Sequence, residues 1–80
     1  MNERLKNEGR LSIKEKEAKK AKLLMEGLRD AIREELDEFE DIDTLDVARA
    51  FELMTELAGK MLSYKELANE IRRLKKALGK

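Results

Sequence analysis

The sequence predicts an all-α protein, an antiparallel hairpin of two long helices over about residues 12–40 and 44–78. Three observations support this fold class. Charged residues make up 45% of the 80 residues and hydrophobic ones 41%, and Ala, Glu, Lys, Leu and Arg, all good helix formers, dominate the chain. Proline is absent. Apolar residues recur every three or four positions through most of the chain, which is the spacing of one face of a helix.

Residues 1–11 are expected to form a flexible lead-in, and residues 12–80 a single helical domain. The first helix is predicted to begin near Ser12, because Ser12 and Glu15 have the spacing of a capping box. Within this helix only Gly27 disfavours helical structure. The apolar face that extends to the predicted end near residue 40 consists of Ala18, Ala21, Met25, Leu28, Ile32, Leu36 and Phe39.

Residues 41–43 are predicted to connect the helices, with Asp43 or Thr44 as the cap of the second helix and Ile42 and Val47 as a hydrophobic staple. The two helices would be about 42 Å and 52 Å long, so they can pair along most of their length. In that pairing Phe39 lies near Val47. The predicted heptad seam of the second helix is Val47, Ala50, Met54, Leu57, Met61, Tyr64, Ala68, Ile71, Lys75 and Leu78.

A second reading divides the second helix near Ser63. Gly59 could end a helix, and Ser63 to Glu66 forms another capping box, with Leu62 and Leu67 at the staple positions. The chain would then form a three-helix bundle. The pattern alone leaves this alternative open.

The apolar arc of the second helix is wider than one partner helix can cover, because six apolar residues flank its seam. Homodimerisation into a four-helix bundle would supply another partner, as small domains without disulfides often gain stability by association. The flanking residues are Phe51, Leu53, Ala58, Leu62, Leu67 and Leu74. The predicted self-association face consists of Phe51, Met54, Leu57, Ala58 and Met61.

The missing residue types exclude most catalysis. Without His and Cys the chain lacks the usual general base, the usual zinc ligand and a thiol nucleophile. Glu35 lies at a seam position and Glu38 follows, but helical-bundle metal sites also need His. We therefore expect no enzyme activity, no cofactor and no metal.

The net charge of zero conceals a strong segregation of charge. Residues 34–46 contain eight acidic and no basic residues, so the rest of the chain has 18 basic and 10 acidic residues. In a hairpin the acidic residues gather at the loop and the basic ones at the opposite end. The predicted acidic tip consists of Glu38, Glu40, Asp41 and Asp43. The predicted basic end consists of Lys19, Lys20, Arg72, Arg73 and Lys76.

This pattern predicts a non-enzymatic interaction or oligomerisation module. In one alternative the acidic tip binds a basic surface of another protein, as an inhibitor or adaptor would. In another the basic end binds nucleic acid through phosphate contacts. Acidic residues among the basic ones make nucleic acid the less favoured partner. The longest apolar runs, such as residues 23–25, are too short to cross a membrane, and no signal peptide precedes the first helix, so a cytoplasmic location is expected.

Two stretches resemble known families. Residues 62–71, LSYKELANEI, resemble the first helix of a helix-turn-helix domain, but no turn or recognition helix follows. The order of residues 28–36, then DIDTLD at 41–46, then a leucine-rich helix ending at Leu78 and Gly79 is similar to small helical proteins of Mu-like prophages. That resemblance implies a phage or mobile-element accessory protein.

Overall fold

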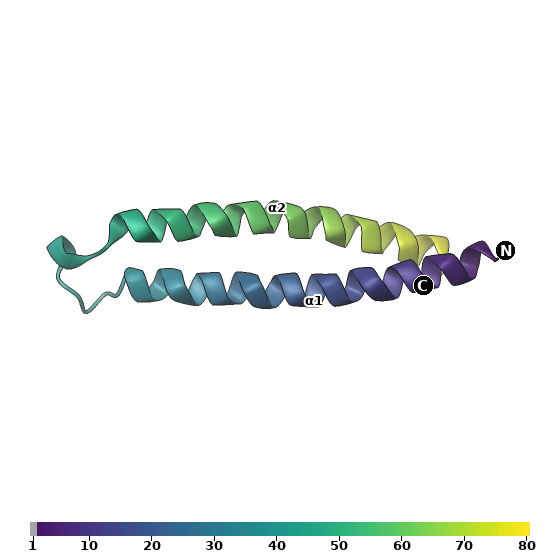
Figure 1. The fold of residues 1–80 in the computed structure, drawn as a ribbon, viewed down its shortest axis with the longest axis horizontal. Helices are drawn as coiled ribbons and strands as arrows, with labels where there is room; N and C mark the ends of the chain where they lie inside the picture. The colour runs from purple at the N-terminus through teal and green to yellow at the C-terminus, as the bar shows by residue number, and fades with distance from the viewer. Residues whose placement is uncertain (1) are drawn as a thin grey trace.

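The computed structural model describes residues 2–80 as two long helices running antiparallel and side by side (Figure 1). Helix α1 comprises Glu3–Glu35, a short 3-10 helix η1 comprises Ile42–Thr44, and helix α2 comprises Val47–Ala77. The described residues form a rod of 63 × 17 × 15 Å. The predicted all-α hairpin is therefore confirmed, although several of its boundaries differ.

Helix α1 begins at Glu3, so the predicted start near Ser12 was wrong. The side chain of Asn2 caps the helix by accepting a hydrogen bond of 2.9 Å from the Arg4 backbone N–H. Leu11 is only 3% exposed, and the Arg4 guanidinium donates to the Leu78 carbonyl at 3.3 Å. These contacts hold residues of the expected lead-in against the end of α2. Their stabilising effect on the longer helix outweighs the local capping signal at Ser12.

Helix α1 ends at Glu35, several residues before the expected end near residue 40. Acidic residues lie close together in this region, and negative charge at a helix C-terminus opposes the helix dipole. Phe39 therefore lies outside the helix and is 89% exposed. Val47 is exposed as well, so the expected contact between Phe39 and Val47 was wrong.

Side-chain and backbone hydrogen bonds order the connection between the helices. The Thr44 hydroxyl donates to the Asp41 carbonyl at 2.9 Å, which engages it within η1. The cap of α2 is instead Asp46, whose carboxylate accepts a hydrogen bond of 3.0 Å from the Arg49 backbone N–H. The predicted caps, Asp43 and Thr44, were thus two to three residues too early.

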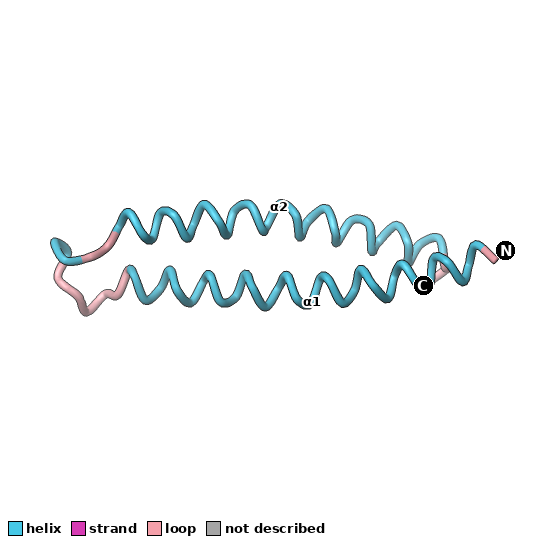
Figure 2. The backbone as a smooth tube through the Cα atoms, in the orientation of Figure 1, coloured by secondary structure: helices cyan, strands magenta, loops and turns pink. Residues whose placement is uncertain are grey.

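Helix α2 is continuous, with Ser63 in its interior, which excludes the three-helix alternative (Figure 2). It ends in a Schellman motif, in which the Lys80 N–H bonds to the Lys75 carbonyl at 2.8 Å and the Gly79 N–H to Lys76 at 3.1 Å. Gly79 has a φ of 74°, the left-handed conformation that this motif requires. The end of α2 is therefore fixed by its own backbone.

The face of α2 that packs on α1 is rotated relative to the predicted seam. One predicted heptad series, from Ala50 to Leu78, does face α1. The second series is different, because the hairpin covers leucines that the sequence pattern places on the flank. The buried and half-buried apolar residues of α2 and its cap are Ala50, Leu53, Leu57, Tyr64, Leu67, Ala68, Ile71, Leu74 and Leu78. The predicted seam residues that are exposed instead are Val47, Met54, Met61 and Lys75.

This rotation has a physical reason. Each of the two competing series contains one lysine, Lys60 or Lys75, but the series beginning at Leu53 brings three leucines to the seam, whereas the series beginning at Val47 would bring a valine, two methionines and an alanine. In the observed arrangement the Lys75 ammonium remains half-exposed and lies 4.0 Å from the Glu15 carboxylate. Both the leucines and the lysine thus lie in environments that suit them.

Candidate functional site

The rotation of α2 leaves a continuous row of apolar side chains pointing away from α1. These residues follow one another at steps of four and three, so they share one face of the helix. Phe51 is 69% and Met54 49% exposed, and neither is part of the hairpin core. We call this row the outer stripe, and it consists of Val47, Phe51, Met54, Ala58 and Met61.

The outer stripe overlaps the predicted self-association face in four of five positions. Leu57 was assigned to that face but is half-buried in the seam with α1. Val47 belongs to the stripe but was assigned to the seam. The signal that could have found it is the heptad relation of Val47, Met54 and Met61, since residues seven apart lie on the same side of a coiled-coil helix.

The stripe occupies the half of α2 that adjoins the loop (Figure 1). From Val47 to Met61 it extends about 21 Å along the helix. A contiguous apolar surface of this size is typical of an interaction site rather than of scattered surface leucines. The described side chains hold no buried polar atom without a hydrogen-bond partner.

The predicted acidic tip lies in the connection between the helices, and all four of its residues are exposed. Asp37 is tied to this turn, because its carboxylate accepts a hydrogen bond of 3.0 Å from the Phe39 backbone N–H. The tip is therefore an ordered turn with its charges at the surface. The residues of the predicted tip are Glu38, Glu40, Asp41 and Asp43.

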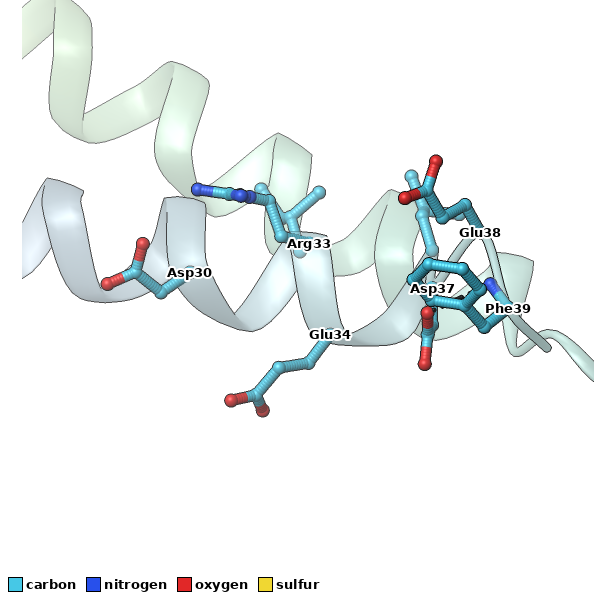
Figure 3. A pocket seen from close by; sticks show the side chains of 8 residues that line it. Asp30, Arg33, Glu34, Asp37, Glu38 and Phe39 are labelled. Atoms are coloured by element: carbon cyan, nitrogen blue, oxygen red, sulfur yellow. Dashed lines mark hydrogen bonds between the residues drawn. The ribbon is translucent and has the colours of Figure 1, made fainter.

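An open hollow of about 850 Å³ lies beside this turn, at the end of α1 (Figure 3). Figure 3 shows Phe39 beside Asp37 where the chain leaves the helix, with Glu34 pointing away from the other labelled side chains. Four carboxylates and the Arg33 guanidinium line it together with apolar groups. Among residues 2–80, no group of three or more His, Cys, Asp or Glu residues is arranged to hold a metal ion. The hollow is thus an open surface depression, and the described residues form no metal-ligand set there.

The predicted basic end is spread along the rod. All five of its residues are exposed, but Lys19 and Lys20 lie nearer the middle of α1 than its start. Acidic residues of the same region form ion pairs across the helices, since the Lys14 ammonium lies 3.0 Å from the Glu70 carboxylate. The hydrogen bond to Glu70 raises the pKa of Lys14 above its ordinary value of 10.5, and the charges of Glu70 and Glu17 add to this effect.

Comparison of the chain with protein-family models, with curated proteins and with solved structures finds no match. Within residues 2–80, neither helix is both long and apolar enough to cross a membrane. Binding of another protein at the acidic tip and of nucleic acid at the basic end stay predictions. The outer stripe is the feature whose chemistry the geometry defines best.

Proposed function

We propose that this chain is a non-enzymatic helical module that self-associates through the outer stripe of α2. The observation that carries the proposal is the continuous exposure of apolar side chains from Val47 to Met61 on one helix face. A helix with a second apolar face is stabilised when another helix covers it, because burial removes apolar surface from water.

The small size of the hairpin supports this proposal. Only five hydrophobic residues of the described chain are buried, and none of them is an aromatic residue. A single small core of this kind supplies little stability, so association is a common way to increase it. The buried residues are Leu11, Met25, Ala50, Leu53 and Leu78.

The lack of His and Cys in the whole sequence supports the proposed non-enzymatic character of the module. Covalent catalysis most often uses a thiol, or a hydroxyl activated by an adjacent base such as His. The resemblance to small helical proteins of Mu-like prophages supports an accessory role in a phage or mobile element.

Analytical ultracentrifugation over a micromolar concentration series tests self-association. The wild-type chain is expected to sediment with twice its 9.3 kDa mass. The double variant Phe51→Glu, Met54→Glu is expected to sediment as a monomer, because two buried carboxylates would lose their hydration at the interface. Far-UV circular dichroism shows whether its helices persist.

The double variant Leu23→Glu, Leu24→Glu is the matched control, because Leu23 (68%) and Leu24 (51%) are about as exposed as Phe51 (69%) and Met54 (49%) but lie on α1. This variant is expected to remain a dimer. A wild-type chain that is monomeric throughout the series would overturn the proposal. Equal dissociation of the Leu23→Glu, Leu24→Glu variant would show that the effect of the charges is not specific to the stripe.

A further inference from the structure

The face of the hairpin that carries the outer stripe also carries charges of opposite sign at the two ends of the stripe. The acidic tip precedes Val47 at one end. Lys65 continues the stripe at the other end, since it lies seven residues after Ala58 and fourteen after Phe51. Residues at multiples of seven share one side of a coiled-coil helix, so Lys65 points to the same side as the stripe.

Lys22 of α1 lies on the same side of the hairpin as Lys65, and the ion pair between Lys75 and Glu15 shows why. Lys75 lies 28 residues, or four heptads, after Val47 and thus on the stripe side of α2. The Lys75 ammonium reaches Glu15 of α1 at 4.0 Å, which places Glu15 on the same side of the hairpin. Lys22 lies one heptad after Glu15 and therefore shares that side.

Lys22 and Lys65 also lie at the same level of the rod. The cross-helix pairs Lys14–Glu70 and Lys75–Glu15 set the register of the two helices. Residues that face each other have residue numbers whose sum lies between 84 and 90. The numbers of Lys22 and Lys65 add to 87. One face of the hairpin thus presents, in order, the acidic tip, the apolar stripe with Arg29 of α1 beside it, and a pair of lysines.

This order makes the face complementary to itself under a two-fold rotation about Met54. Lys65 lies eleven residues after Met54 and Asp43 eleven residues before it, about 16 Å along α2 for the helical segment. Stacking two copies stripe on stripe in antiparallel orientation places the acidic tip of each against the lysine pair of the other. Such an isologous contact closes as a dimer.

The parallel alternative covers the stripe equally well but has the opposite electrostatics. It places the two acidic tips, and with them the eight acidic residues that each copy has over residues 34–46, next to each other. Helices in contact lie about 8–10 Å apart, which is close to the Debye length of about 8 Å at physiological ionic strength, so the repulsion is only partly screened.

The footprint of the antiparallel arrangement is adequate for a specific dimer. The two hairpins overlap over about 40 Å, from one tip to the other, and the rod is 17 Å wide. This corresponds to about 700 Å² per protomer, close to the roughly 800 Å² of a standard protein interface.

We infer that the partner of the outer stripe is a second copy of this chain in antiparallel orientation, held in register by its acidic tip against Lys22 and Lys65. This inference rests on the proposed self-association. It adds the orientation of the two copies, the residues that set it and a prediction of salt dependence.

Distance measurement between nitroxide labels tests the orientation. The chain has no cysteine, so the variant Ile42→Cys provides one labelling site per protomer, in the tip. In the antiparallel dimer the two labels are expected about 35–40 Å apart, whereas in a parallel dimer they lie within about 20 Å. A dimer with the short distance overturns the antiparallel inference but leaves self-association standing. A monomer overturns both.

Charge reversal tests the contacts that set the orientation. The double variant Lys22→Glu, Lys65→Glu is expected to dimerise at least tenfold more weakly than the wild-type chain, because each tip then meets carboxylates. The control is Lys20→Glu, Arg73→Glu, which makes the same change in net charge at exposed positions of the same two helices. Equal weakening in both variants overturns the assignment of Lys22 and Lys65. Dimerisation that strengthens with added salt overturns it as well.

Discussion

Replacing Leu53 by alanine is expected to destabilise the hairpin strongly, because this side chain faces α1 and is 5% exposed. The sequence pattern placed Leu53 on the flank of α2, so the perturbation tests the observed rotation of the helix directly. Leu23→Ala is the matched control. It removes the same atoms from the interior of a helix, but Leu23 is 68% exposed.

The magnitude follows from the carbon atoms withdrawn from the core. Leucine has three carbon atoms more than alanine, and each contributes about 0.8 kcal/mol when buried, or about 2.4 kcal/mol together. Nearly all of this is lost at Leu53, and a cavity would add to the cost. About a third, or about 0.8 kcal/mol, is lost at Leu23. A chain of this size has about 4–12 kcal/mol of stability in total, so the first loss is a large fraction.

Urea unfolding followed by far-UV circular dichroism measures both free energies at one protein concentration. Neither residue belongs to the outer stripe, so self-association affects both variants alike. The Leu53→Ala variant is also expected to lower the midpoint of thermal unfolding by about 10 °C or more. If both substitutions cost the same, or if Leu53→Ala costs less than about 1 kcal/mol, the observed seam is incorrect.

Three further predictions concern the ends of the helices and the ion pair between them. Asp46→Ala is expected to lower the free energy of unfolding by about 1 kcal/mol because Asp46 caps α2, whereas Ser63→Ala inside the helix should leave it unchanged. Urea unfolding measures both values. A loss of stability in the Ser63→Ala variant would indicate a helix break at Ser63. Gly79→Ala is expected to cost about 1 kcal/mol or more at its φ of 74°, and an unchanged unfolding curve would contradict the Schellman motif. The Glu70 carboxylate raises the pKa of Lys14, so this pair stabilises the fold below pH 10.5 and the contribution is lost as the pH rises through the raised pKa. Thermal unfolding of Glu70→Gln is expected to differ from wild type at neutral pH and to converge with it well above pH 10.5; a difference that persists there would have another cause.

The hairpin itself could be predicted because its determinants are local. Regular apolar spacing and a single interruption near residues 41–43 are enough to give two helices that fold back on each other. The end of α1 at Glu35 was also within reach, since the acidic residues that follow oppose the helix dipole. Its start at Glu3 was not, because it depends on contacts of Arg4 and Leu11 at the far end of the hairpin.

The candidate site was predicted in part for a similar reason. Two heptad series in α2 compete for the seam, one beginning at Val47 and one at Leu53. The spacing of the apolar residues alone favours neither series over the other. Which series packs in the seam depends on α1, which covers only one side of α2. In the observed packing Lys75 is able to reach Glu15. The acidic tip needed no such information, because its residues are adjacent in the sequence.

The hydrogen bond between Arg4 and the Leu78 carbonyl has a consequence for how the chain folds. It joins residues 74 positions apart, whereas the helices first face each other across a connection of only eleven residues, from Leu36 to Asp46. Closing a long loop costs more entropy than closing a short one. Once the turns next to the connection have met, each later turn adds contacts over a short additional segment. We expect the hairpin to close from the loop outward, with the Arg4 contact formed last and broken first.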